Sequence, residues 1–201
     1  MSSRLLERAR ALTLGAFVLR PECRHILLVR VPLGADELAD GLRRAFGEGV
    51  PPVSERPTIV DFETAMTEIS ALGTDLDAFR FGQRELRDWI SEGQCFPVPL
   101  VERSGERDGR ILLGRSRSAD LSLRRGGISK RHAIFEEDSE GALWVEDSGS
   151  RNGTKVDGEP LMAGERVELR RGGHLTFGSI EALYCSAELF WAVAQEPASH
   201  P

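Results

Sequence analysis

Three loop clusters in the second half of the sequence carry side chains suited to binding an anion. They are Gly114-Arg115, Ser129-Lys130-Arg131-His132 and Gly149-Ser150-Arg151-Asn152-Gly153-Thr154. Each cluster lies between short apolar runs, so its polar side chains are expected on turns and not inside strands. Arg115 offers a planar fork of N–H donors, Lys130 a point charge and Ser129 a hydroxyl, which together suit one tetrahedral dianion such as a phosphate. The pattern therefore indicates a binding surface rather than a reaction centre.

Composition limits the class of protein that carries these loops. The 201 residues suffice for one large domain, or for one ordinary domain with a substantial extension. Hydrophobic residues make up 40% and charged residues 29%, which is typical of a globular chain. The formal net charge is -6, and the basic residues are interleaved with acids. A protein that wraps nucleic acid usually has a broad basic stripe, so no nucleic-acid partner is expected.

The apolar segments predict no membrane partner. The longest apolar runs, such as Ile26–Val29, are far too short to span a bilayer. The first residues, Met1-Ser2-Ser3-Arg4, lack the apolar core of a signal peptide. A cytoplasmic location is therefore expected. Arginine greatly outnumbers lysine, which occurs only at Lys130 and Lys155, and this bias favours a bacterial origin.

Cysteine and histidine spacing predicts neither a metal site nor a cofactor. The cysteines are odd in number, far apart and without a CxxC pair: Cys23, Cys95 and Cys185. We interpret them as reduced packing residues. The histidines also lack any ligand spacing: His25, His132, His174 and His200.

The first thirty residues allow two interpretations. Leu12–Leu19 and Ile26–Val31 are β-type runs joined by the turn-like segment Arg20–Arg24, which predicts a β-hairpin within residues 12–31. Alternatively, Ser2–Phe17 forms one amphipathic helix with Leu5, Ala9, Leu12 and Ala16 on one face. We expect a short helix followed by the hairpin.

The rest of residues 1–94 is expected to be mostly helical, with a role that the sequence does not reveal. Ala35–Phe46 has a helical apolar face and ends before the stop signal Gly47. Gly47–Pro57 is a loop or linker by its glycines and prolines. Two further helices are predicted over Thr58–Leu72 and Gly82–Ser91.

From about residue 95 the pattern changes to short β-type runs separated by Gly-, Ser- and Asp-rich turns. The runs are Phe96–Val101, Arg110–Leu113, Leu121–Leu123, His132–Glu136, Leu143–Glu146, Lys155–Val156, Arg166–Leu169, His174–Phe177 and Glu181–Cys185. Many short strands with close turns predict an antiparallel β-sandwich. Ser186–Gln195 has helical spacing. The expected fold is therefore α+β, with an α-rich region over 1–94 and a sandwich with a short terminal helix over 95–195.

These motifs resemble those of the forkhead-associated (FHA) domain, whose set is Gly-Arg, then Ser-x-x-His, then an Asn-Gly turn, on a sandwich of about eleven strands. The sequence supplies Gly114-Arg115, Ser129 through His132, and Asn152-Gly153 in that order. Asp120-Leu121, Val145-Glu146-Asp147 and Val156-Asp157-Gly158 agree with the family pattern between and after them. The resemblance covers roughly residues 96–185 and leaves the N-terminal half outside it.

The resemblance implies that loops at one end of the sandwich bind a phosphothreonine in an extended peptide, a mode in which Arg clusters meet the phosphate. It implies that Arg115 and Ser129 contact the phosphate and that Lys130 adds a third contact. Asn152 is expected to hydrogen-bond the ligand main chain beside the phosphothreonine. Arg151, at a position where the family often has threonine or serine, either adds a cation to the site or extends into solvent.

Other motif residues are expected to shape the loops. By resemblance, His132 stabilises its loop from within. Gly114 and Gly153 permit turns that a Cβ would strain. Arg131 faces either an acidic ligand residue or solvent.

Two other functions compete with this one. Ser129, His132 and Asp120 or Asp147 have the residue types of a hydrolase triad, but Ser129 and His132 are three residues apart on one turn and no Gly-x-Ser-x-Gly elbow surrounds the serine. We therefore predict no enzymatic activity. The alternative to phosphopeptide binding is a phosphorylation-independent scaffold or oligomerisation module.

The expected partners are a phosphothreonine-containing protein or peptide and a Ser/Thr kinase or its substrate, and the protein is interpreted as a signalling adaptor. Thr58-Ile-Val-Asp61 and Thr74-Asp-Leu-Asp77 each place aspartate three residues after threonine. Either could serve as an internal ligand if phosphorylated. Thr58 is equally suited to be a helix N-cap, and Thr74 to lie in an ordinary turn.

Overall fold

The computed structural model describes residues 4–12, 14–20, 24–47, 76–91, 94–103, 105, 108–170 and 172–195. The described part of the N-terminal half is mostly helical and contains one strand: α1 (Arg4–Ala11), α2 (Leu14–Val18), β1 (His25–Arg30), α3 (Asp36–Phe46) and α5 (Leu76–Ser91). The C-terminal half is almost entirely strands: β2 (Cys95–Pro99), β3 (Ile111–Gly114), β4 (Leu121–Ser122), β5 (Ala133–Glu137), β6 (Leu143–Asp147), β7 (Thr154–Val156), β8 (Glu159–Pro160), β9 (Arg166–Glu168), β10 (His174–Phe177) and β11 (Ile180–Ser186), followed by α6 (Ala187–Gln195).

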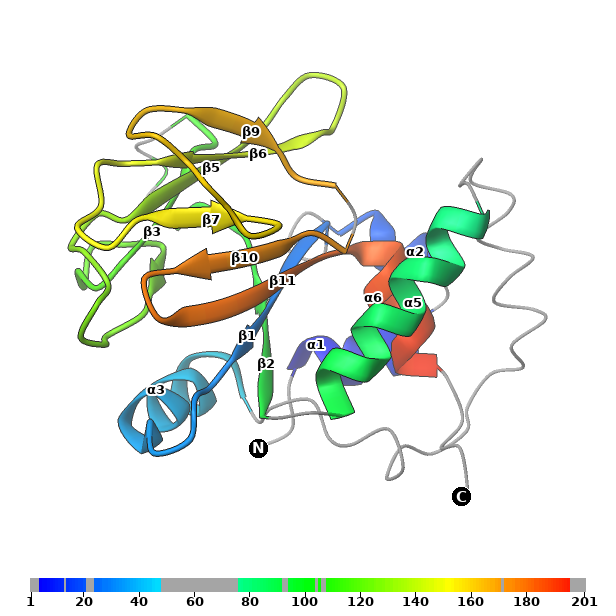
Figure 1. The fold of residues 1–201 in the computed structure, drawn as a ribbon. Helices are drawn as coiled ribbons and strands as arrows, with labels where there is room; N and C mark the ends of the chain where they lie inside the picture. Colours follow the sequence, from blue (N-terminus) through cyan, green and yellow to red (C-terminus); the bar gives the residue numbers. More distant parts are fainter. Residues whose placement is uncertain are drawn as a thin grey trace.

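The strands form two sheets packed face to face as a β-sandwich, so the fold is α+β (Figure 1). One sheet has six strands in the order β2-β1-β11-β10-β7-β8, and the other has five in the order β4-β3-β5-β6-β9. Neighbouring strands are antiparallel except for β3 and β4, which are parallel. Between the sheets lies a large apolar core that includes Phe96, Phe135 and Phe177. Phe135 and Phe177 meet edge to face with ring centroids 6.0 Å apart.

Strand β1 belongs to two cores at once. It pairs with β11 on one side and β2 on the other. Because alternate residues of a strand point to opposite faces, Leu27 and Val29 enter the core between the sheets, whereas Ile26 and Leu28 enter a second apolar core. All four side chains are completely buried. This two-sided burial explains why the run is apolar throughout instead of alternating.

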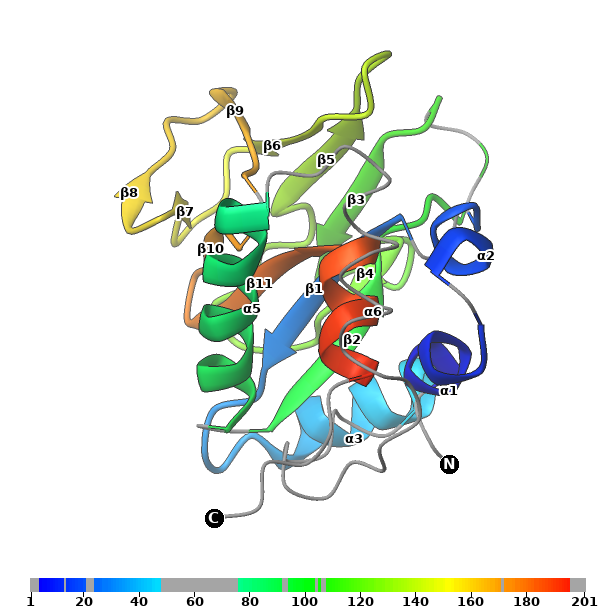
Figure 2. The ribbon, with the colours of Figure 1, turned by 90° about the vertical axis from the view of Figure 1, so that its right-hand side faces the viewer.

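The second core is closed by helices that cover the outer face of the six-stranded sheet. Helices α1, α2, α5 and α6 lie in front of β1, β2 and β11 in Figure 2. Phe17 of α2 stacks on Phe190 of α6 at 6.3 Å between centroids, and Trp191 Nε1 donates a 2.9 Å hydrogen bond to the carbonyl oxygen of Leu12. None of the helices in the described parts of the chain is long and apolar enough to cross a bilayer.

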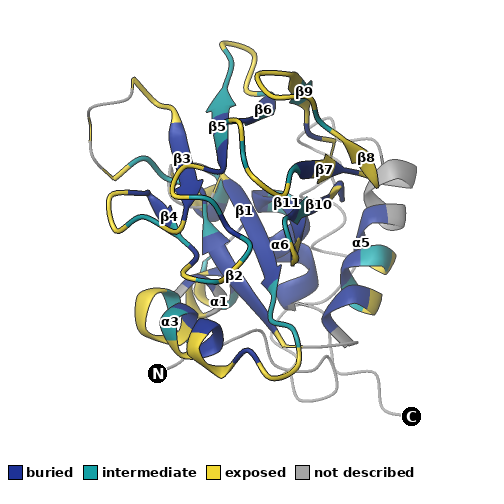
Figure 3. Ribbon diagram, turned by 60° about the vertical axis from the view of Figure 1, so that its left-hand side comes forward, coloured by how far each residue is buried: buried dark blue, intermediate teal, exposed yellow. Residues whose placement is uncertain are grey.

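The five-stranded sheet is covered differently, because its outer face is lined by charged side chains. Arg110 forms two ion pairs, from Nη2 to Glu146 Oε2 at 3.2 Å and from Nε to Glu136 Oε2 at 3.5 Å. Arg166 Nη1 also lies 3.5 Å from Glu136 Oε2. The Arg166 guanidinium lies over the ring of Trp144, 4.9 Å from its centroid. In Figure 3, β1 of the six-stranded sheet is buried, whereas β9, at the edge of the five-stranded sheet, is mostly exposed.

The β-hairpin expected within residues 12–31 is wrong. Leu14–Val18 is the helix α2, whose Leu14 and Phe17 are buried against the other helices. Strand β1 pairs with β11 and β2, which lie far along the chain, and not with the preceding segment. Burial of Leu14 and Phe17 three residues apart fits a helix, and the long-range pairing satisfies β1 without a hairpin.

The other expected elements mostly form where the pattern places them. Helix α3 ends at Phe46, and Gly47 follows with φ of 92°, in the region that favours glycine. The helix expected over Gly82–Ser91 is the C-terminal part of the longer α5. The helix expected over Thr58–Leu72 and nearly all of the loop Gly47–Pro57 lie outside the described residues.

In the second half, each expected strand has a counterpart, and the terminal helix forms as α6. The short edge strand β8 was not predicted, because its two residues, Glu159 and Pro160, are exposed and have little β propensity. The expected division at residues 94 and 95 stays a prediction. Strand β1, which precedes it, and strand β2, which follows it, are neighbours in the same sheet.

Candidate functional site

The first motif lies at the end of β3, where the chain leaves the sandwich. The Arg115 backbone N–H donates to the Ser129 carbonyl at 2.9 Å, and the Ser116 N–H donates to the Lys130 carbonyl at 3.3 Å. A Cβ on Gly114 would overlap the carbonyl oxygen of Lys130. Glycine at this position therefore lets the Arg115 loop and the Ser129 loop lie side by side, which sets the Arg115 side chain beside Ser129.

His132 ties this pair of loops to the third cluster. Its side chain is fully buried, its Nδ1 accepts a 3.0 Å hydrogen bond from the Ser129 backbone N–H, and its Nε2 is 3.2 Å from the Gly153 carbonyl oxygen. Because an N–H donates to Nδ1, the ring is neutral with its proton on Nε2, which donates to Gly153. Burial lowers the pKa of His132, against the opposing effects of the Gly153 carbonyl and Asp147. The ring is thus a neutral link between two loops.

Asp147, at the end of β6, shapes the turn that carries Arg151 and Asn152. Its carboxylate accepts hydrogen bonds from the Ser150 N–H at 2.8 Å, the Ser150 hydroxyl at 2.7 Å and the Thr154 hydroxyl at 2.7 Å. Burial acts to raise the pKa of Asp147, but the hydrogen bonds from Thr154 and Ser150 outweigh it and lower the pKa. An ionised Asp147 therefore fixes the turn from beneath.

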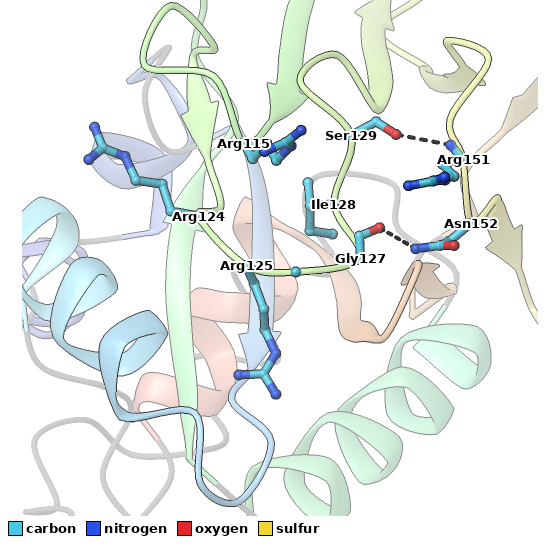
Figure 4. A pocket seen from close by; sticks show the side chains of 9 residues that line it. Arg115, Arg124, Arg125, Gly127, Ile128, Ser129, Arg151 and Asn152 are labelled. Atoms are coloured by element: carbon cyan, nitrogen blue, oxygen red, sulfur yellow. Dashed lines mark hydrogen bonds between the residues drawn. The ribbon is translucent and has the colours of Figure 1, made fainter.

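Side chains of the second and third clusters join across the gap between their loops. The Arg151 backbone N–H donates to Ser129 Oγ at 2.9 Å, and Asn152 Nδ2 donates to the Gly127 carbonyl at 2.9 Å (Figure 4). Ser129 Oγ makes this contact with Arg151, while His132 Nδ1 is bound to the Ser129 main chain. The serine and histidine are therefore not arranged as a nucleophile and its base.

These loops enclose an open pocket of about 610 Å³. It is lined by Arg115, Arg124, Arg125, Gly126, Gly127, Ile128, Ser129, Arg151 and Asn152. Arg115 and Arg151 approach its centre from opposite sides (Figure 4). Arg124 and Arg125 extend outward from the loop that leads to Ile128 and forms one wall of the pocket. Ile128 is buried, so it anchors that loop in the core.

The pocket has the electrostatic character of an anion site. Among the described residues that line it, none is acidic. No ion pair joins Arg115, Arg124, Arg125 or Arg151 to any acid in the described parts of the chain. Elsewhere, by contrast, exposed arginines such as Arg110 and Arg166 have carboxylate partners. Four unpaired guanidinium groups in a chain of net charge -6 form a local concentration of positive charge.

The structure brings together four of the five residues predicted to bind a ligand: Arg115, Ser129, Arg151 and Asn152 line the pocket. Lys130 is exposed and is not among the lining residues. Gly114, His132 and Gly153 lie behind the pocket and hold its loops, as described above. Arg131 lines a separate hollow with Asp108 and Ile134.

Arg124 and Arg125 line the pocket but are not among the residues predicted from the sequence. The signal is the run Arg124-Arg125-Gly126-Gly127, which directly precedes the buried Ile128 and the Ser129 motif. Two adjacent cations followed by two glycines mark an exposed turn. Because that turn leads into a binding motif, its cations are placed at the rim of the same pocket.

The comparison with family models identifies a match over this part of the chain. Residues 111–178, which run from β3 to the end of β10 and include every lining residue of the pocket, match the model described as FHA domain. No curated protein sequence matches the chain.

Three solved structures illustrate the similarity. The N-terminal FHA domain of Rad53p from S. cerevisiae, in complex with a phosphothreonine peptide, is 20% identical over 50% of this chain and 92% of that one, with a TM-score of 0.41. The FhaA FHA domain complexed with the intracellular domain of Rv3910 is 25% identical over 46% and 88%, with a TM-score of 0.36. Mycobacterium tuberculosis EmbR, in complex with a low-affinity phosphopeptide, is 23% identical over 48% and 23%, with a TM-score of 0.38.

Proposed function

We propose that the chain binds phosphothreonine-containing peptides in the pocket between Arg115 and Asn152, within the residues 111–178 that match the FHA domain model. The observation that carries the proposal is the set of unpaired arginines around this pocket. A phosphorylated side chain brings close to two negative charges and three acceptor oxygens. Guanidinium groups answer these with charge-assisted, frequently bidentate hydrogen bonds.

Arg115, Arg151 and Ser129 are proposed to contact the phosphate. Arg115 and Arg151 supply the cations, since their side chains approach the centre from opposite sides (Figure 4). Ser129 Oγ accepts from the Arg151 N–H and still has its own hydroxyl hydrogen to donate to a phosphate oxygen. The bond from Arg151 holds that hydroxyl at the pocket wall.

Asn152 is proposed to bind the ligand main chain beside the phosphothreonine. Its Nδ2 uses one N–H on the Gly127 carbonyl, which fixes the plane of the amide. The second N–H and the carbonyl oxygen Oδ1 stay available for one acceptor and one donor of an extended peptide. An amide oriented in this way binds the backbone of the ligand and is indifferent to its side chains.

We propose a binding and not a catalytic role, as a signalling adaptor. The Ser129 hydroxyl is not bound to His132, so the residues that resemble a triad lack its geometry. The proposal includes a Ser/Thr kinase, or a substrate of such a kinase, as the source of the phosphothreonine, and a bacterial cytoplasm as the location. Recognition of the mark would then recruit the phosphorylated partner.

Calorimetric titration with one peptide sequence in three forms, bearing phosphothreonine, phosphoserine or threonine, tests the proposal. The phosphothreonine form is expected to bind and the unphosphorylated form to show no binding. Arg115→Ala should weaken phosphopeptide binding by about 2–5 kcal/mol, because one cation facing the phosphate is removed. Arg117→Ala is the matched control, since Arg117 is exposed two residues away and does not line the pocket. Equal affinity for phosphorylated and unphosphorylated peptides would contradict the proposal.

A further inference from the structure

The pocket holds more positive charge than one phosphate uses. Arg115 and Arg151 approach its centre, whereas Arg124 and Arg125 lie on the wall nearest to α3 (Figure 4). Two cations balance the charge of a single phosphate dianion, which is close to two. Arg124 and Arg125 therefore have no counter-charge in the ligand proposed above, and they form no ion pair with any described residue of the chain.

A second hollow begins where the first one ends. It has a volume of about 300 Å³ and is lined by Glu37, Leu38, Arg124, Arg125, Gly126 and Ser179. Three of these residues, Arg124, Arg125 and Gly126, also line the first pocket, so the two hollows adjoin at this loop. A peptide bound in the first pocket therefore lies next to the arginine pair.

The wall opposite the two arginines comes from outside the matched FHA segment. Glu37 and Leu38 belong to the first turn of α3, and α3 lies between β1 and β2 in the chain. The N-cap position of α3 is Ala35, which makes no side-chain cap hydrogen bond. The N-terminal end of a helix carries partial positive charge and uncapped N–H groups, both of which favour an anion nearby. The same first turn also carries the acidic side chains Asp36 and Glu37, so its backbone favours an anion while these carboxylates oppose one. The positive charge of the hollow therefore comes from Arg124 and Arg125.

The loop that displays the arginines is anchored at both ends. Leu123 and Ile128 are buried on either side of it. Within the loop, the Arg125 N–H donates to the Leu123 carbonyl at 3.0 Å and the Ile128 N–H donates to the Arg125 carbonyl at 3.2 Å. The Gly127 carbonyl is held by Asn152. The two arginines are thus displayed from a fixed turn, which limits the entropy lost when they bind a ligand.

We propose that Arg124 and Arg125, beside the first turn of α3, form a second anion subsite that binds an acidic or phosphorylated side chain flanking the phosphothreonine. The preferred ligand is then a phosphothreonine peptide with an additional negative charge, and this inference rests on the proposed phosphothreonine binding. Glu37 is the one acid among the lining residues of this hollow, and it has no ion-pair partner in the described parts of the chain. Its charge opposes a second anion, so it sets the strength of the preference.

The test compares four peptides of one sequence, bearing phosphothreonine alone, phosphothreonine with glutamate, phosphothreonine with phosphoserine, and threonine with glutamate. The second group is moved through each position within four residues of the phosphothreonine on both sides. The wild-type chain should bind at least one doubly anionic peptide about threefold or more tightly than the singly anionic one, as exposed charge pairs allow. This gain should shrink when the salt concentration is raised from 0.05 to 0.5 M, because the interaction is exposed to solvent.

Variants that remove either the cations or the acid of the hollow identify the residues responsible for the affinity gain. The double variant Arg124→Ala/Arg125→Ala should abolish the gain from the second anion, and Glu37→Gln should enlarge it. The matched controls are Arg117→Ala and Glu159→Gln, because Arg117 and Glu159 are exposed and do not line the hollow. Since the gain is a ratio of two affinities of one variant, a loss of folding does not imitate it.

A second anion that gives no gain at any position would overturn the subsite. A gain that survives in the double arginine variant would overturn it as well. The glutamate and phosphoserine peptides distinguish a carboxylate from a phosphate as the second group. Failure of phosphothreonine binding itself is a separate result, recognised by equal affinities for the phosphothreonine and threonine forms of the glutamate peptide.

Discussion

The two sheets of the sandwich differ in what covers their outer faces. The five-stranded sheet, from β3 to β9, lies within the residues that match the FHA domain model, and its outer face carries the charged network of Arg110, Glu136, Glu146 and Arg166. The six-stranded sheet takes β1 from residues 25–30 and is covered by α1, α2, α5 and α6. The outer face of the five-stranded sheet is exposed to solvent, whereas that of the six-stranded sheet is buried under helices. The N-terminal helices thus complete the fold by covering a sheet to which their own half of the chain contributes β1.

The loops that line the arginine pocket lie at the end of the sandwich and belong mainly to the five-stranded sheet. They connect β3 to β4, β4 to β5, and β6 to β7. The helical layer packs on the other sheet, and among the described N-terminal elements α3 contributes Glu37 and Leu38 to the hollow that adjoins the pocket. The region proposed to bind a ligand is therefore separate from the helical layer that stabilises the fold.

The largest expected effect comes from two adjacent residues of β1 that face opposite cores. Leu27 points between the sheets and Leu28 toward the helices, and both are completely buried. Leu27→Ala and Leu28→Ala should each lower the free energy of unfolding by about 2–5 kcal/mol, because each opens a cavity that the surroundings only partly fill. Chemical denaturation measures this loss.

The tryptophans make this pair of variants a test of how the two regions cooperate. Trp144 lies on the five-stranded sheet, and Trp89 and Trp191 lie in the helical layer. With single-tryptophan variants, both Leu substitutions should shift the unfolding midpoints of Trp144 and Trp191 together. If Leu28→Ala moves the Trp191 transition and leaves that of Trp144 in place, the helical layer unfolds on its own and the comparison fails.

The next largest effect concerns the base of the binding loops. Gly114→Ala places a Cβ against the Lys130 carbonyl, so the backbone of one loop must move. The expected cost is about 1–3 kcal/mol of unfolding free energy, together with loss of phosphopeptide binding. Gly15→Ala in α2 is the control, since a Cβ there meets no atom within 4 Å and should be neutral or slightly stabilising. Unaltered peptide affinity in Gly114→Ala would show that the close approach of these loops is unnecessary.

A smaller effect is expected from lowering the pH, which should reduce the unfolding free energy through one histidine beneath the pocket loops and one at the start of β1. Burial lowers the pKa of His132 beneath the binding loops and the pKa of His25 at the start of β1. The unfolded chain therefore binds more protons than the folded one once the pH falls below the usual histidine value of about 6.5. Stability is fully present above that pH and is lost as the pH falls from it toward the folded-state pKa, by at most about 1.4 kcal/mol per pH unit for each proton.

Substitution of each histidine separates the two regions in this pH experiment. Both His132→Asn and His25→Gln should flatten the dependence of the unfolding free energy on pH below 6.5. Only His132→Asn should also weaken phosphopeptide binding, because His132 joins Ser129 to Gly153. Equal loss of binding in both variants would place His25 in the binding region and so contradict the division.

The smallest effect is expected on the exposed face. Arg110→Ala removes contacts with Glu136 and Glu146 that are open to solvent. The unfolding free energy should fall by less than about 1 kcal/mol, and by still less at high salt. A loss as large as that of Leu28→Ala would mean that this face stabilises the fold as strongly as the covered one.

The sequence predicted what depends on local spacing. Gly114, Arg115, Ser129, His132 and Asn152 are identified by motifs only a few residues long, and the strands between them alternate clearly enough to locate. The same holds for α3, whose apolar face and following Gly47 mark its end.

What the sequence did not predict depends on contacts between distant parts of the chain. The partner of β1 is β11, more than 150 residues later, so no local pattern distinguishes this strand from half of a hairpin. Arg124 and Arg125 have no chemical signature of their own, and they reach the pocket because Leu123 and Ile128 are buried on either side of them. Lys130 has the right charge within the right motif, yet it lies outside the lining of the pocket.

Phosphothreonine binding in the arginine pocket is tested most directly by an NMR titration of the labelled full chain with a phosphothreonine peptide and with its unphosphorylated form. The phosphopeptide should shift the backbone amide signals of Arg115, Ser129 and Asn152, and the unphosphorylated peptide should leave them in place. Signals from the helical layer, such as those of Phe17 and Trp191, should not move with either peptide. Shifts that are the same for both peptides, or that map to the helices or to the Arg110 face instead of the pocket, would contradict the account.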